Sequence, residues 1–252
     1  MMNHNKIGIA DYGMNVYYGG MLDYDTRMEQ IKAIGYDGLE RLEPLNEADL
    51  IHKMKTLARL GMDFGTVRCS KIDLNIQWTA AVGRKYIWVN SPDSRDGLET
   101  LCRQANILAK TCAKYGIKCG IHNHLGTPVQ TQEELETFLE KCPEVGIVYD
   151  VGHMAVAGGD VVKIAQTYAD RVLAVHFKEW CYTTDARDIP WYEQGYFTGL
   201  GQGTFAVDNH GVANALLERG YTGWFYIEQD THHREPLTDL EQSRNVMRSW
   251  GL

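Results

Sequence analysis

The hydrophobic pattern of the chain alternates between short β-rich runs and longer amphipathic stretches. Eight runs rich in β-branched and aromatic residues predict strands within residues 6–10, 38–43, 63–70, 86–90, 118–124, 145–150, 172–180 and 224–230. Between them, apolar residues recur at three- and four-residue spacing, which predicts helices that bury one face, as in residues 26–35, 47–61, 99–116 and 131–142. Helix ends are expected at the glycines that best tolerate a left-handed cap: Gly35, Gly61, Gly116 and Gly220.

This alternation predicts an α/β protein with parallel strands and helical crossovers. Eight strand–helix units in 252 residues match the length of a (β/α)8 TIM barrel, and no linker or low-complexity stretch divides the chain. We therefore expect one domain over residues 1–252, with an open doubly wound sheet as the alternative. Residues 181–207 break the pattern with a long stretch rich in glycine and aromatic residues. A connection of this length predicts an active-site loop.

The composition of the chain argues against several classes of partner. The chain carries 25 basic and 33 acidic side chains, a net charge of −8, which argues against a nucleic-acid partner and against anionic membrane surfaces. No apolar run approaches the roughly 20 residues of a membrane span. Residues 1–13 lack the apolar core of a signal peptide, so we expect a cytoplasmic protein. The six scattered cysteines are expected to be core thiols.

Polar residues gather where the predicted strands end, which is where TIM barrels hold their chemistry. The later strands end with His122 and His124, with Asp150, with His176 and Lys178, and with Glu228 and Asp230. Residues two apart on a strand share a face. If the first of each pair faces the barrel axis, one set of side chains converges there: His122, Asp150, His176 and Glu228. The alternative is that these are ordinary capping or loop residues.

Two imidazoles and two carboxylates form a donor set for a divalent metal ion. Such a set suits manganese, cobalt, zinc or iron. Magnesium fits less well, because it prefers oxygen ligands and retains water. We expect manganese or cobalt first, with zinc, iron or magnesium as alternatives.

Five segments carry a resemblance to a known family. They are GIHNHLGTPVQTQEELETFL at 120–139, IVYDVGHMAVAGGD at 147–160, RVLAVHFKEW at 171–180, GLGQGTFAVD at 199–208 and GYTGWFYIEQD at 220–230. As a set they resemble the xylose isomerase-like TIM-barrel superfamily of sugar isomerases, epimerases and dehydratases, and within it the inosose dehydratases. The resemblance covers about half of the chain. In the first half only GYDGLE at 35–40 is similar to the superfamily.

The resemblance places the family's metal ligands on Asp150, His176 and Glu228, and a substrate-binding histidine on His153. His122 stands where the family usually has a glutamate, in an H-N-H rather than an E-x-H motif. Related ketose epimerases move protons with two glutamate ligands, and this chain has one of them. The resemblance therefore favours proton abstraction from one side of the substrate.

The implied activity is abstraction of a proton next to a ketone, through a metal-bound enediolate, with Glu228 as the base. Protonation of a β-hydroxyl by His124, Lys178 or His153 would make the enzyme a dehydratase acting on an unphosphorylated keto-polyol, a free sugar or a cyclitol. The alternatives are a sugar isomerase or ketose 3-epimerase, and a non-catalytic sugar-binding barrel.

Further substrate contacts are expected at strand ends and in the long loop. Glu40, Arg68 and Asn90 lie near strand ends, while Arg187 and Trp180 lie in or beside residues 181–207. Trp191 and Tyr192 lie in the same loop. These aromatic residues suit a wall that closes over substrate, or else the interface of a homo-oligomer.

Overall fold

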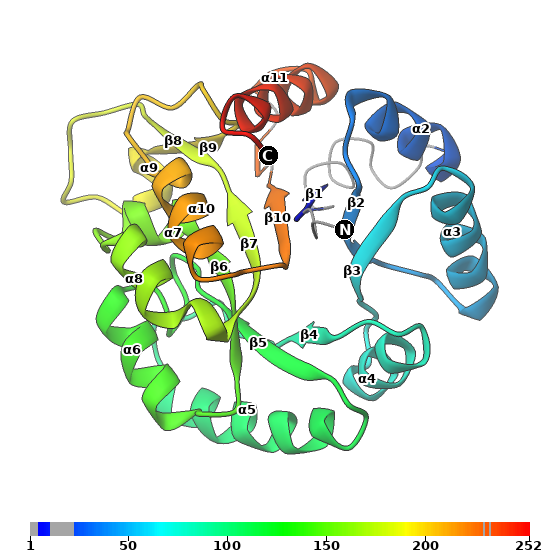
Figure 1. Ribbon diagram of the computed structural model, residues 1–252. Coiled ribbons are helices and arrows are strands. Elements are labelled where there is room, and N and C mark those ends of the chain that lie inside the picture. Colours follow the sequence, from blue (N-terminus) through cyan, green and yellow to red (C-terminus); the bar gives the residue numbers. More distant parts are fainter. Residues whose placement is uncertain (1–4, 11–22, 229, 232) are drawn as a thin grey trace.

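The predicted strands form a ring with the helices outside it, as the computed structural model of the chain shows (Figure 1). The structure describes residues 5–10, 23–228, 230–231 and 233–252. Most of the N-terminal stretch on which the expected location rests therefore lies outside the described residues.

All eight predicted strands are present, together with two strands of a small second sheet. The strands are β1 Lys6–Ile9, β2 Gly38–Leu42, β3 Asp63–Val67, β4 Tyr86–Trp88, β5 Lys118–His122, β6 Gly146–Asp150, β7 Val172–Phe177, β8 Glu179–Tyr182, β9 Gly195–Thr198 and β10 Trp224–Ile227. The helices are α2 Tyr24–Ile34, α3 Glu47–Arg59, α4 Ile72–Ala81, α5 Leu98–Ala113, α6 Gln132–Lys141, α7 Val151–Val156, α8 Val161–Tyr168, η1 Ala169–Arg171, α9 Trp191–Gln194, α10 Asn209–Glu218 and α11 Pro236–Ser249.

The barrel strands are parallel and follow the order β3-β2-β1-β10-β7-β6-β5-β4. The ends of this order meet where the Thr66 hydroxyl on β3 donates to the Tyr86 carbonyl on β4 at 2.6 Å. The ring is thus nearly closed, which confirms the predicted TIM barrel and excludes the open doubly wound sheet.

The helices bury the faces that their apolar spacing predicted. Helix α5, for example, buries Leu101, Cys102, Ala105, Ala109 and Cys112 against the barrel. The four predicted glycine caps all have positive φ, from 63° to 101°. All six cysteines are free thiols, and five of them are buried, as expected for core residues.

The predicted seventh strand is wrong in its extent. Residues 172–180 do not form one strand, because the chain breaks at Lys178 and β8 leaves the barrel to pair antiparallel with β9. Residues 181–207 are therefore not a plain loop: they include part of this β8–β9 hairpin and helix α9, which lie together in Figure 1. The reason is local, because the buried Trp180 and Phe197 give the hairpin a small core of its own.

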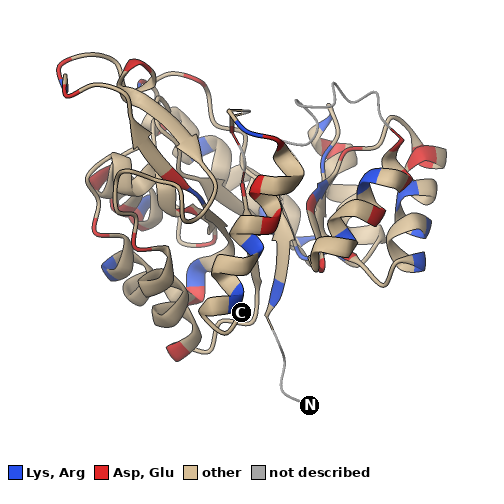
Figure 2. Ribbon diagram, turned by 90° about the horizontal axis from the view of Figure 1, so that it is seen from above, with Lys and Arg blue, Asp and Glu red and all other residues tan. Residues whose placement is uncertain are grey.

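The outer surface carries charges of both signs. Lys and Arg are interspersed with Asp and Glu along the outer helices (Figure 2). Among the described helices, none has both the length and the apolar character needed to span a membrane.

Candidate metal centre and cavity

The strand ends bring together the four residues expected to bind a metal. His122, Asp150, His176 and Glu228 each offer a ligand atom, and these atoms lie within 4.8 Å of one another. Parallel register explains the convergence: Asp150 and His176 pair across β6 and β7. The Glu228 backbone N–H donates to the Phe177 carbonyl at 3.2 Å, which sets Glu228 beside the end of β7.

The donor atoms in this cluster fit a divalent cation. His122 Nε2 lies 3.4 Å from Asp150 Oδ2, and neither buried atom has a hydrogen bond in the described part of the chain, although Asp150 Oδ2 forms an ion pair with Lys178. Buried polar atoms without hydrogen bonds are costly. A cation shared by two imidazoles and two carboxylates would satisfy them. The residues present therefore fit the expected metal.

Lys178 is the cation that these carboxylates contact. Its side chain is fully buried, and Nζ lies 2.8 Å from Asp150 Oδ2, 2.5 Å from Glu228 Oε2 and 2.6 Å from Asp230 Oδ2. The Asp150 contact is an ion pair outside hydrogen-bond geometry. Burial opposes the charged forms, yet the ammonium and neighbouring histidines hold the pKa of Asp150 and of Glu228 well below the usual range. The same carboxylates raise the pKa of Lys178 well above its ordinary value.

His176 lies between carboxylates on both of its ring nitrogens. Nδ1 is 3.1 Å from Glu228 Oε2 and 3.7 Å from Asp150 Oδ2, while Nε2 is 2.9 Å from Glu40 Oε2. Burial disfavours the charged ring, but Glu40 and Glu228 raise the pKa of His176 well above its ordinary value. His176 thus joins the Glu40 carboxylate to the Glu228 carboxylate through its two ring nitrogens.

Glu40 takes a different place from the substrate contact that the sequence predicted. Glu40 lies in the middle of β2, and its carboxylate is fully buried and does not belong to the cavity wall. Its oxygens accept from Tyr86 Oη at 3.2 Å, Trp88 Nε1 at 2.9 Å and His176 Nε2. Protein donors thus engage both oxygens of the Glu40 carboxylate.

Leu125 sets the tautomers of the two remaining histidines. His124 Nδ1 lies 2.6 Å from the Leu125 carbonyl, which can only accept, so Nδ1 carries the proton. The Leu125 N–H donates to His153 Nδ1 at 3.4 Å, so His153 carries its proton on Nε2, a buried atom without a hydrogen bond among the described residues. Burial, with the nearby charge of Lys178, lowers the pKa of both rings. At neutral pH His124 presents a lone pair and His153 presents an N–H.

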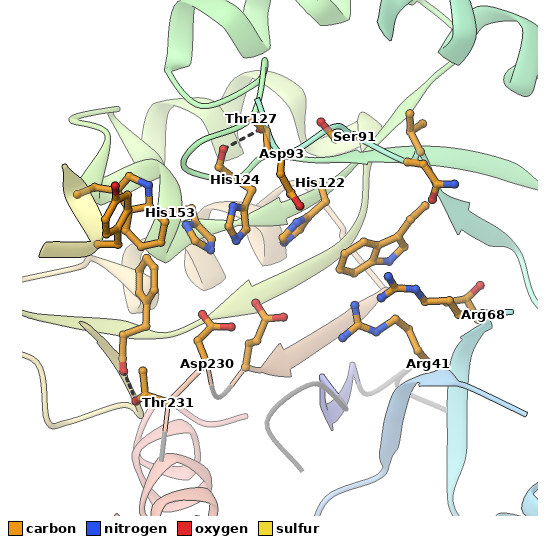
Figure 3. Close-up of a pocket in the computed structure, with 18 of the residues that line it drawn as sticks. Arg41, Arg68, Ser91, Asp93, His122, His124, Thr127, His153, Asp230 and Thr231 are labelled. Atoms are coloured by element: carbon orange, nitrogen blue, oxygen red, sulfur yellow. Dashed lines mark hydrogen bonds between the residues drawn. The ribbon is translucent and has the colours of Figure 1, made fainter. Parts of the chain in front are cut away.

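A cavity of about 820 Å³ opens over the cluster (Figure 3). The imidazoles of His122, His124 and His153 point into it from one side, and Arg41 and Arg68 lie on another. Its wall includes Glu228 and Asp230, the predicted Asn90, and Trp180, Trp191, Tyr192, Tyr196 and Phe197 of the hairpin region.

Arg187 is not brought to this cavity. Its guanidinium lies over the ring of Tyr182, 3.7 Å from the centroid, and it donates to the carbonyls of Thr184 and Ala186. The β8–β9 connection thus holds the Arg187 side chain outside the cavity wall.

The sequence analysis did not identify Trp88 or the Leu125 peptide as parts of the site, and it named Asp230 at a strand end without giving it a role. Trp88 stacks on His122 with ring centroids 4.4 Å apart, and Asp230 has a pKa raised by burial. Trp88 is the last residue of β4, so the strand-end rule could have found it. The role of the Leu125 peptide could not have been found in this way, because a backbone hydrogen bond to a ring leaves no signal in residue type.

Comparisons with known proteins agree with the fold. A family profile described as xylose isomerase-like TIM barrel matches residues 47–250, and the chain belongs to this family. An inosose dehydratase of Lactiplantibacillus plantarum is 33% identical over 150 residues, covering 55% of this chain and 49% of that protein. An inosose dehydratase of Mesomycoplasma hyopneumoniae is 26% identical over 270 residues, covering 92% and 90%.

The first of these alignments spans only about half the length of the relative that it matches. Among solved structures, an L-ribulose 3-epimerase has the same fold, with a TM-score of 0.71 and 15% identity over 98% of this chain and 94% of that one. The fold and the family are thus shown, and the relatives are sugar-modifying enzymes by name.

Proposed function

We propose that this chain is a metal-dependent dehydratase of an unphosphorylated keto-polyol, comparable to the inosose dehydratases that it resembles. One observation carries the proposal: four ligand atoms lie within 4.8 Å of one another, and a buried lysine contacts two of the same carboxylates. The family membership and the names of the relatives support it. Manganese or cobalt is the expected metal.

A divalent cation in this site would polarise a substrate ketone and acidify the neighbouring C–H bond. The chain supplies the base. Glu228 belongs to the cavity wall and is 5% exposed, and its low pKa keeps it a carboxylate at neutral pH. In the proposed reaction the Glu228 carboxylate takes the proton from the carbon next to the ketone.

Lys178 and Asp230 are positioned to supply a proton for the leaving group. Lys178 Nζ donates to Asp230 Oδ2, and Asp230 belongs to the cavity wall. In the proposed elimination the C–O bond at the β-carbon breaks, a carbon–carbon double bond forms, and the hydroxide leaves as water with a proton from this pair. One proton is taken and one is given, so no further reactant is needed.

His124 and His153 would hold the polyol during these steps. A neutral His124 offers Nε2 as an acceptor for a substrate hydroxyl, and His153 offers Nε2–H as a donor. Their rings lie 3.7 Å apart, so they can bind neighbouring hydroxyls. Trp191 and Tyr196 on the hairpin side would pack on the apolar face of the ring.

The test is turnover of inososes and unphosphorylated keto-sugars by protein loaded with manganese or cobalt, followed by mass spectrometry. We expect a product that is lighter than the substrate by one water, and we expect that no such product forms after chelation. A product of unchanged mass and altered stereochemistry would instead identify an isomerase or epimerase. Binding without metal-dependent turnover would identify a sugar-binding barrel.

A further inference from the structure

We propose that Glu40 is a positioning residue that selects Nδ1 of His176 as the metal-binding atom. The inference rests on the metal site of the proposed function and concerns a residue that does not touch substrate. Three hydrogen bonds end on the buried Glu40 carboxylate.

The Glu40 carboxylate faces donors on both oxygens. Oε1 accepts from the Trp88 indole at 2.9 Å and from the Tyr86 hydroxyl at 3.2 Å, and Oε2 lies 2.9 Å from His176 Nε2. A carboxylate without a proton can only accept. The proton between Glu40 and His176 therefore belongs to the imidazole, on Nε2.

This arrangement leaves one nitrogen of His176 for a metal. Nδ1 is the atom that faces the other ligands, at 3.1 Å from Glu228 Oε2 and 3.7 Å from Asp150 Oδ2. A histidine that binds a metal through one nitrogen commonly donates from the other to a carboxylate, which fixes the ring and increases its basicity. Glu40 satisfies this requirement from β2, across the barrel from β7.

Trp88 contacts both Glu40 and His122, the second histidine of the proposed metal site. Its N–H holds Glu40, while its ring stacks on His122 with an interplanar angle of 24°. The indole N–H can only donate, so whatever replaces Glu40 must keep an acceptor at that position.

The Glu40→Gln variant tests this requirement. Glutamine has one acceptor oxygen, which the Trp88 indole would take, so its NH₂ would face His176 Nε2. A donor at that place favours a His176 tautomer with the proton on Nδ1, the atom needed by the metal. We expect Mn²⁺ and Zn²⁺ to bind Glu40→Gln about 10–100-fold more weakly than wild type, as measured by chelator competition.

The matched control is Glu43→Gln, which makes the same chemical change three residues further on, at a side chain that is 39% exposed and pairs with Arg68. It is expected to bind both ions as wild type does. Glu40→Gln with wild-type affinity would overturn the inference. If wild type itself binds neither ion, the metal site of the proposed function fails and the inference fails with it.

Wild-type protein gives a second readout that does not depend on how the variant folds. In long-range ¹H–¹⁵N spectra of the Zn²⁺-loaded protein, His176 should have a protonated Nε2 and a metal-bound Nδ1. A proton on Nδ1, or a metal on Nε2, would overturn the role assigned to Glu40.

Discussion

Lys178 Nζ lies 2.5 Å from Glu228 Oε2, and neither side chain is more than 6% exposed. The ammonium thus contacts the carboxylates that a divalent cation would bind, since it also lies 2.8 Å from Asp150 Oδ2. The Lys178 ammonium and a bound divalent cation would therefore be stabilised by the same carboxylates, those of Asp150 and Glu228.

Lys178→Met should destabilise the metal-free protein by about 3–5 kcal/mol, because it leaves buried carboxylates without their cation. Urea unfolding with and without metal measures this, and added Mn²⁺ should restore much of the loss. Turnover should fall about 10²–10⁴-fold in the metal-loaded variant, if Lys178 donates the proton. Unchanged turnover would assign proton delivery to another group.

Glu228→Gln should reduce turnover about 10²–10⁴-fold, because the amide cannot take the proton from carbon. Substrate binding, measured by calorimetry, should persist, since the cavity keeps its shape. Metal content has to be measured in parallel, because Glu228 is also one of the four expected ligands. Near-normal turnover would remove Glu228 from the role of base.

His122→Ala should weaken metal binding by at least about 10–100-fold, because it removes one of four clustered donors. Elemental analysis after dialysis against defined metal concentrations measures this. His52→Ala serves as control, since His52 lies on α3 and pairs with Asp25 instead. Equal metal content in the two variants would mean that His122 only occupies the family's ligand position.

Acid should destabilise the metal-free protein in two stages. Burial keeps the pKa of His153 well below 6.5, so the unfolded chain binds this proton first and stability falls as the pH drops below 6.5. Asp150 and Glu228 have pKa values held well below 3.8 and 4.5, so their stabilisation is complete above pH 4.5 and is lost as the pH falls further. The raised pKa of His176 acts in the opposite sense, stabilising below pH 6.5 and losing this effect as the pH rises through the folded value.

The free energy of unfolding, measured in urea from pH 8 to pH 3, tests this order. His153→Gln should reduce the first stage and leave the second. Stability that stays level below pH 4.5 would contradict the ion pairs described around Lys178.

Trp191→Ala should raise KM for a polyol substrate about 10-fold or more, because removing a large apolar side chain from the cavity wall costs about 1.5–3 kcal/mol of apolar contact. Trp191 belongs to the cavity wall, whereas Arg187 lies over Tyr182 at the hairpin. Arg187→Ala should therefore have the smaller effect on KM in steady-state kinetics. A larger effect of Arg187→Ala would mean that the hairpin moves to bring it onto the substrate.

The sequence by itself determined the order of strands and helices, and so the barrel. Hydrophobic residues recur with a period of two in strands and of 3.6 in helices, and these patterns indicate which face of each element is buried. Eight such units leave few ways to close a sheet. The same alternation places His122, Asp150, His176 and Glu228 at neighbouring strand ends, so the candidate metal cluster could be predicted from residue type and position alone.

Only the tertiary structure decided what each polar side chain faces. Glu40 is far from His176 in sequence and meets it across the barrel axis, and periodicity carries no information on such a pairing. The break at Lys178 depends on the hairpin core formed with Phe197, and the position of Arg187 depends on Tyr182. A local pattern specifies burial, whereas hydrogen-bond partners follow from the register and closure of the whole barrel.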